Sequence, residues 1–290
     1  MANLPGAPRQ RTLRREILLS GIGLHTGREG TLRIGPAAPG EGLVFFCQGR
    51  RVPALAENVA PSARCTRLAA DGAEVLTPEH VLAALYGLRV DNARLDLEGP
   101  EVPILDGSAL PFAQAIREAG IVAQETAARV LALPRPVWTA AGDRHVLALP
   151  ADHFAMTVAT AFGRACAGPA VFHLHFPRNG GDDAAVEPFL HQLAPARTFC
   201  FQDEVAAILA SGLGAGGTLE NALVLSDEGP SRPLRFDDEP IRHKALDLLG
   251  DLALLGGRLA AHVIAVKAGH ALHTAAAEQI RRMADDTTVC

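Results

Sequence analysis

The order of apolar and polar residues divides the chain into short alternating segments and a few longer apolar ones. Alternation between Gly-rich turns predicts strands, while a capping residue, an early Pro and a closing Gly mark helices. In the first part of the chain we expect strands at 14–20, 30–34, 42–47, 65–69 and 92–98, and helices at 78–87 and 110–119.

The second part of the chain repeats the outline of the first. Here we expect strands at about 136–139, 144–149, 155–160, 222–225 and 260–267, a polar loop at 179–183, and helices at about 201–211, 240–255 and 274–284. Each half contains strands, a helix with a His near its start, a strand, a turn and a helix. The pattern therefore predicts an α+β protein of two similar domains, residues 1–127 and 128–290, joined within 121–134.

The helix predicted at 240–255 carries polar residues on an otherwise apolar surface. Pro240 suits its first turn, and the acidic run before it suits a cap and the helix dipole. His243, Asp247 and Asp251 follow one another at intervals of one turn, so they share one face. Such groups are costly to bury unless they are paired, and a His and an Asp one turn apart can also bind one metal ion. This helix alone leaves both interpretations open: a buried ion pair or half of a metal site.

The helix predicted at 78–87 supplies a second histidine. Thr77 is the expected N-cap and Pro78 the first helical residue, which places Glu79 and His80 in the first turn. The helix dipole there favours an ionised Glu and a neutral imidazole. If a pseudo-twofold axis relates the halves, His80 and His243 meet at one inter-domain cleft.

Two histidines and one carboxylate leave zinc an open position, as in catalytic rather than structural sites. His80, His243 and Asp247 are therefore the candidate ligands. Consecutive side chains on a helix differ in direction by about 100°, so Glu79 is better placed as a base than as a ligand.

Two further residues gain interest from their neighbours. Lys244 is one of only two lysines in the chain and directly follows a candidate ligand, where a compact charge suits an anion; a chance surface Lys is the alternative. His270 lies in a predicted Gly-flanked turn, and a carboxylate such as Asp251 would make it a competent general acid; a merely exposed loop His is the alternative. The remaining histidines are interpreted as structural or solvent-facing: His25, His145, His153, His173, His175, His191, His262 and His273.

Composition narrows the class of protein. The formal charge is −5 with no basic patch, which argues against nucleic acid as a partner. Five cysteines without a C-x-x-C pair argue against a disulfide framework or a Cys-based zinc site, and fit a reducing cytoplasm. The apolar run at 17–24 is too short and Gly-rich for a signal peptide, and no run reaches the roughly 18 residues of a membrane span.

The segment 212–217 matches G-x-G-x-x-G, the pattern of dinucleotide-binding loops. In those loops the glycines follow a strand and open a helix. Here they follow a predicted helix and precede a strand, so we reject that function and expect a helix end and a tight turn.

The chain resembles the zinc-dependent UDP-3-O-acyl-N-acetylglucosamine deacetylase family of lipid A biosynthesis (LpxC). The resemblance covers nearly the whole length, in seven ordered segments: 21–27 (GIGLHTG), 77–80 (TPEH), 101–108 (EVPILDGS), 196–199 (ARTF), 212–219, 242–251 (RHK with Asp247, Gly250 and Asp251) and 269–272 (GHAL). It implies two similar α+β domains, each a β-sheet layer packed on a helix pair, in a two-domain sandwich with the active site at the inter-domain cleft.

The resemblance also implies a role for each matching residue. The zinc ligands would be His80, His243 and Asp247, a set that Fe²⁺ also fits. The catalytic residues would be Glu79 as general base, His270 as general acid with Asp251 near it, Thr198 at the oxyanion and Lys244 at the substrate. The acyl-chain passage would be lined by the segment from Phe199 to Val205 together with Gly217 and Thr218.

The implied activity is removal of acetate from the 2-amino group of UDP-3-O-acyl-N-acetylglucosamine, by a cytoplasmic and monomeric enzyme. Two alternatives are a zinc amidase acting on another acylated sugar and a non-catalytic protein that binds a nucleotide sugar or an acyl chain. The departures from the family pattern are modest: a His at 273, where other residues are frequent, a short loop at 226–235 and a brief tail after Ala284.

Overall fold

The computed structural model describes all residues except 1–7, 165–166, 178–180 and 287–290. The alternating segments of the first part form one sheet in the order β2-β3-β8-β4-β5. Its strands are β2 (Ile17–Ile22), β3 (Glu29–Pro36), β4 (Leu43–Cys47), β5 (Arg50–Pro53) and β8 (Ala93–Glu98). The alternation has the expected cause, because Leu32 and Ile34 of β3 are fully buried on one face while Arg33 between them is exposed.

Two strand pairs lie beside this sheet. One is the hairpin of β6 (Arg67–Ala70) and β7 (Ala73–Leu76), which turns at Asp71 and Gly72 as the sequence predicts. The other joins β1 (Arg9–Leu13) to β9 (Ile121–Ala127), so the start of the chain pairs with the segment before residue 128.

The second part of the chain forms another sheet, in the order β11-β12-β18-β13-β14 with β10 beside β18. Its strands are β10 (Val130–Ala132), β11 (Val137–Ala141), β12 (Arg144–Pro150), β13 (Ala155–Arg164), β14 (Ala167–His175) and β18 (Arg258–Val266). A smaller sheet contains β15 (Phe199–Phe201), β16 (Leu223–Ser226) and β17 (Gly229–Pro230).

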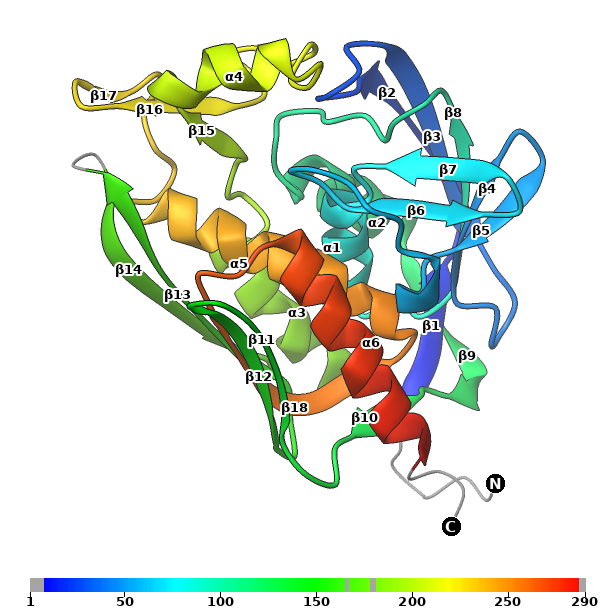
Figure 1. Ribbon diagram of the computed structural model, residues 1–290. Helices are drawn as coiled ribbons and strands as arrows, with labels where there is room; N and C mark the ends of the chain where they lie inside the picture. The colour runs from blue at the N-terminus through cyan, green and yellow to red at the C-terminus, as the bar shows by residue number, and fades with distance from the viewer. Residues whose placement is uncertain (1–7, 165–166, 178–180, 287–290) are drawn as a thin grey trace.

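Helices fill the space between the two larger sheets (Figure 1). The helices of the described residues are α1 (Glu79–Gly87), α2 (Leu110–Ala119), α3 (Gly181–Gln192), α4 (Val205–Ala210), α5 (Glu239–Leu252) and α6 (His270–Asp286), with 3-10 turns η1 (Ala56–Asn58), η2 (Gln202–Glu204) and η3 (Ala253–Leu255). Every residue of α1 is buried, and α1 packs on α5, which in turn contacts α6 and the second sheet. Only α4 lies apart, with β15–β17, at one end of the molecule (Figure 1). Among the helices of the described residues, none is both long and apolar enough to span a membrane.

The predicted α+β class is confirmed, but some local predictions are wrong. The predicted polar loop at 179–183 is helical from Gly181 (residues 179 and 180 lie outside the described residues), because α3 buries Phe189 against Gly87 of α1. Strand β14 is missing from the predicted order. The helix predicted from 274 begins at His270, so this residue is the first of α6 rather than part of a turn.

The predicted helix cap at Thr77 is also wrong. Thr77 donates its hydroxyl to Oε1 of Glu101 at 2.7 Å and makes no cap bond to α1. A buried partner distant in sequence thus outcompetes the local interaction that the pattern suggests. Glu239 lies in the first turn of α5, as the sequence predicts, and is fully buried there, where Nε of Arg197 donates to its Oε1 at 2.8 Å.

Candidate metal centre and its cavity

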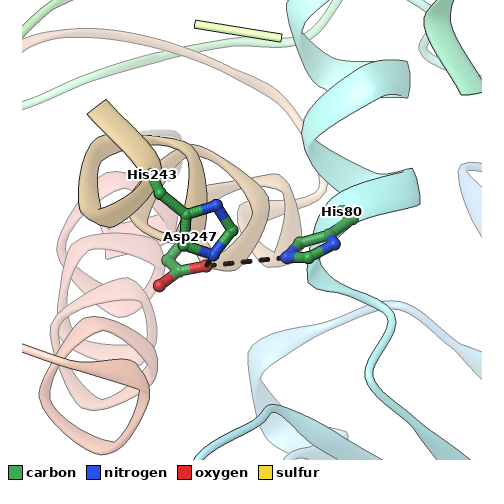
Figure 2. Close-up of side chains that lie close together, drawn as sticks. All are labelled: His80, His243 and Asp247. Carbon is green, nitrogen blue, oxygen red and sulfur yellow. Dashed lines mark ion pairs between the residues drawn. The ribbon is translucent and has the colours of Figure 1, made fainter. Parts of the chain in front are cut away.

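The centre lies where α1 and α5 pack against each other. Figure 2 shows His80 extending from α1 towards His243 and Asp247, which lie one turn apart on α5. Nε2 of His80 is 3.9 Å from Oδ1 of Asp247, and Nε2 of His243 is 3.2 Å from the same oxygen. All three side chains are buried, and one ligand atom from each lies within 4.8 Å of the others.

The protonation states suit a cation. Nδ1 of His243 lies 3.1 Å from the carbonyl oxygen of Ala196, which only accepts, so Nδ1 carries a hydrogen and Nε2 is the ring nitrogen left to bind a cation. Burial and the neighbouring His243 lower the pKa of His80 to about 3, which keeps that ring neutral. Ligands about 2.0–2.1 Å from a tetrahedral zinc ion lie roughly 3.3 Å apart. The two measured separations bracket that value, so this donor set fits the ion.

Lys244 sits beside the carboxylate rather than on an open surface. Its Nζ donates to Oδ2 of Asp247 at 2.7 Å. Burial alone would raise the pKa of Asp247, but Lys244 and His243 outweigh burial and hold that pKa well below its ordinary value. Asp247 is therefore an anion whose Oδ1 faces both histidines.

Glu79 and His270 face each other beside these residues. Oε1 of Glu79 lies 3.7 Å from Nε2 of His270, which is also 3.9 Å from Oδ2 of Asp247. Burial raises the pKa of Glu79 to about 8. Burial would lower the pKa of His270, but the carboxylates of Asp251, Glu79 and Asp247 together raise it to about 10. The pair thus combines a carboxyl group of raised basicity with an imidazole that holds its proton.

Asp251 lies behind His270 and is fully buried. Its Oδ2 is 2.8 Å from Nδ1 of His270 and 2.9 Å from Nδ1 of His273, and its Oδ1 accepts the hydroxyl of Thr66 at 2.5 Å. The structure therefore separates the polar stripe of α5 into two parts: His243 and Asp247 face His80, and Asp251 faces α6.

A cavity of about 820 Å³ opens over these groups. With the exception of Asp251, all candidate residues from the sequence line it: Glu79, His80, Thr198, Phe199, Val205, Gly217, Thr218, His243, Lys244, Asp247 and His270. Further apolar lining comes from Phe162, Phe201, Ile208 and Leu209. We call the lining from α1, α5 and the start of α6 the polar wall, and the mainly apolar lining from α4, the β15–β16 segment and the tip of β13 the apolar wall.

The 212–217 segment is the turn that the sequence predicts. Gly212 and Gly214 have φ angles of 78° and 72°, which favour glycine. At Gly216 a Cβ atom would lie 2.1 Å from the carbonyl oxygen of Gly23. The turn thereby packs against the 21–27 loop, and residues of both segments line the cavity.

Three residues near the cavity escaped the sequence prediction. His25, interpreted as structural or solvent-facing, lines the cavity at 7% exposure, and its Nδ1 lacks a hydrogen-bond partner among the described residues. Glu101, fully buried, accepts the backbone N–H groups of His25 and Thr26. Both lie inside segments that carry the family resemblance, which was the available signal. Thr66 lies in none of those segments, and only the fold brings it to Asp251.

Comparison with known proteins identifies the family. A family model described as "LpxC: UDP-3-O-acyl N-acetylglycosamine deacetylase" matches residues 10–282. This chain belongs to the LpxC family.

Similar proteins agree with that membership. The UDP-3-O-acyl-N-acetylglucosamine deacetylase of Syntrophotalea carbinolica is 41% identical, over 95% of this chain and 89% of its own length. The protein of the same name from Myxococcus xanthus is 41% identical, over 93% of this chain and 85% of its own length. A "Bifunctional enzyme LpxC/FabZ" of Chlorobaculum tepidum is 38% identical over 95% of this chain, which spans 65% of that longer protein.

Proposed function

We propose that this LpxC family member is a zinc-dependent deacetylase that converts UDP-3-O-acyl-N-acetylglucosamine and water into UDP-3-O-acyl-glucosamine and acetate, the committed step of lipid A biosynthesis. The observation that carries the proposal is the convergence of His80, His243 and Asp247 within 4.8 Å on the wall of a cavity. Glu79 and His270 stand beside them with raised pKa values.

His80, His243 and Asp247 would hold the metal, with Zn²⁺ as the first choice and Fe²⁺ as an ion that the same donors accept. A bound Zn²⁺ supplies a Lewis acid that polarises a carbonyl group and lowers the pKa of water. Lys244 keeps Asp247 ionised, as a carboxylate ligand must be.

Glu79 and His270 divide the proton transfers. The carboxylate of Glu79 takes a proton from the attacking water as its oxygen bonds to the acetamide carbonyl carbon. Nε2 of His270, held by Asp251 through Nδ1, gives a proton to the nitrogen as the C–N bond breaks and acetate leaves. Thr198 lines the same cavity, and its hydroxyl would donate to the developing oxyanion, with Lys244 close to the substrate.

The apolar wall suits a fatty acyl chain. Phe199, Val205, Gly217 and Thr218 line it, and the two small or short residues leave room between the large ones. Each buried methylene contributes about 0.8 kcal/mol to binding. We therefore assign the 3-O-acyl group to this wall and the sugar to the polar one.

The division into domains is part of the proposal. We assign residues 1–127 and 128–290 to two similar domains, each with a sheet on a helix pair, that enclose the site in their cleft. The pairing of β9 with β1, and of β10 with β18, supports a boundary between residues 127 and 130. The contact between α1 and α5 supports a cleft between helices of different halves. The predicted monomeric state and cytoplasmic location stay predictions.

The test is acetate release from UDP-3-O-acyl-N-acetylglucosamine by the zinc-replete protein, with and without a chelator and across a series of acyl lengths. We expect release that the chelator abolishes, that added Zn²⁺ restores, and that weakens as the acyl chain is shortened. If the protein binds the substrate but releases no acetate, the proposed activity is wrong and the protein is a non-catalytic binding protein. Equal rates on an acylated sugar without UDP would indicate an amidase of broader class.

A further inference from the structure

His273 is a buried histidine that the proposed mechanism does not use. It lies on α6 three residues after His270, at 1% exposure. Side chains three apart on a helix share a face, and both rings point towards Asp251 on α5. Its Nδ1 is 2.9 Å from Oδ2 of Asp251, nearly the same distance as Nδ1 of His270 at 2.8 Å.

The hydrogen bonds around Asp251 define the tautomers. An ionised carboxylate only accepts, so Nδ1 of His270 and Nδ1 of His273 must both carry hydrogens. The hydroxyl of Thr66 donates to the other oxygen, Oδ1, at 2.5 Å. Oδ2 thus accepts two N–H bonds and Oδ1 accepts one O–H bond, which leaves this fully buried carboxylate little freedom to rotate.

His270 needs such support because of its place in the chain. It is the first residue of α6, and a Cβ atom at Gly269 before it would meet nothing within 4 Å. The ring of His270 is oriented through Nδ1, which lies 2.8 Å from Oδ2 of Asp251 and 3.3 Å from the hydroxyl oxygen of Thr66. If Oδ2 accepted only the His270 bond, the carboxylate could turn, and Nε2 of His270 would lose its fixed position 3.7 Å from Glu79.

We propose that His273 is a positioning residue of the deacetylation: its Nδ1–H holds Oδ2 of Asp251 in the direction that aims His270 at the reacting atoms. The inference rests on the proposed role of His270 as general acid. It adds a third member to the Asp251–His270 pair.

The test compares His273→Asn with His273→Leu in the zinc-replete enzyme, with kcat expressed per bound zinc. The two side chains share a branched shape, but only the Asn amide offers an N–H the same number of bonds from Cα as Nδ1 of His. A misplacement of about 1 Å at a reacting group costs on the order of 10²-fold in rate. We expect His273→Leu to lower kcat by about tenfold to 10²-fold while KM stays nearly unchanged. We expect His273→Asn to keep most of the wild-type kcat.

A control separates positioning from stability. Ile280 is fully buried on the same helix and contacts none of these polar groups through a hydrogen bond. Ile280→Ala should lower the melting temperature while kcat, measured well below it, stays near the wild-type value. If kcat instead follows the melting temperature across all three variants, His273 is merely structural and the proposal is wrong.

A double-variant cycle separates this inference from the proposed function. If His273 acts through His270, His273→Leu has little further effect in a His270→Ala background, although it slows the wild type. An equal effect in both backgrounds would overturn the inference alone. Full activity of His270→Ala itself would overturn the proposed general acid. Where His273→Leu fails to fold, His273→Ala replaces it in the same cycle.

Discussion

Gly250 of α5 lies directly against the backbone of Glu79 in α1. A Cβ atom at residue 250 would be 2.1 Å from the Glu79 carbonyl oxygen, far inside contact distance. The backbones of the two helices therefore approach each other closely beside the first turn of α1. This approach brings His80 within 3.9 Å of Asp247, so the candidate metal site depends on a glycine that is not among its proposed ligands.

Replacing that glycine should damage both stability and metal binding. Gly250→Ala forces α1 and α5 apart, and overpacking of this kind typically costs about 1–3 kcal/mol. Urea unfolding gives the free energy of unfolding, and elemental analysis gives the zinc content per chain. We expect both quantities to be lower in Gly250→Ala than in the wild type. Gly168→Ala is the matched control, because a Cβ at that residue of β14 meets nothing within 4 Å. Unchanged zinc content in Gly250→Ala would show that the crossing is not decisive.

Glu79→Gln should separate metal binding from turnover. The amide keeps the shape of the side chain but cannot take a proton, and general-base catalysis contributes roughly 10²–10⁴-fold. We expect a loss of that size in kcat with zinc content unchanged by elemental analysis. Wild-type turnover in this variant would remove Glu79 from the proposed mechanism.

His80→Ala should lower zinc content while the fold survives. The variant loses one of the proposed donors from α1 and leaves His243 and Asp247 on α5 in place. We expect zinc per chain to fall well below one after dialysis, measured by elemental analysis. His175→Ala, which alters an exposed histidine of β14, should keep full zinc content. Equal zinc in both variants would argue against His80 as a ligand.

Asp251→Asn should shift the alkaline limb of the activity profile. Asp251 is the carboxylate that does most to raise the pKa of His270 against the opposing effect of burial. A general acid is active while protonated, so activity is lost as pH rises through its pKa. Removing the carboxylate lowers that pKa, and the limb should move to lower pH in a kcat profile. A limb at the wild-type position would indicate that another group controls it.

Glu239→Gln should destabilise the protein and reduce its acid sensitivity. Glu239 and Arg197 form a buried pair, and removing one charge from such a pair costs about 3–5 kcal/mol. Burial opposes ionisation, but the bonds from Arg197 and Arg235 outweigh it and lower the pKa of Glu239. A lowered folded-state pKa stabilises the fold above the unfolded-state value of about 4.3, and this contribution disappears as pH falls through the folded-state pKa.

Urea unfolding at neutral and at acidic pH tests this. We expect the wild type to lose more stability on acidification than Glu239→Gln, and the gap between them to narrow. The exposed pair of Arg33 and Glu16 offers a control, since Glu16→Gln should change stability by less than about 1 kcal/mol. A constant gap between wild type and Glu239→Gln at both pH values would contradict the assigned pKa direction.

The sequence by itself determined the α+β class, the helix that carries His243, Asp247 and Asp251, and the family. These features depend only on residues that are near one another in sequence. Residues one turn apart on a helix share a face, so their spacing predicts an apolar helix with one polar face, and the family segments are short stretches of sequence. Local pattern failed where burial against a distant segment decided the conformation. Phe189 makes α3 a helix against Gly87, and Glu101 takes the hydroxyl of Thr77 away from the helix cap.

Only the tertiary structure decided how closely these polar groups meet and which further residues join them. Residues 80 and 247 are far apart in sequence, and their distance depends on how closely two backbones pack, which Gly250 permits. Only the fold also brings Thr66, from the segment before β6, and His273 of α6 to the buried carboxylate of Asp251, where their donors join that of His270. A buried carboxylate needs hydrogen-bond donors from the groups packed around it, so the fold rather than the local sequence determines its partners.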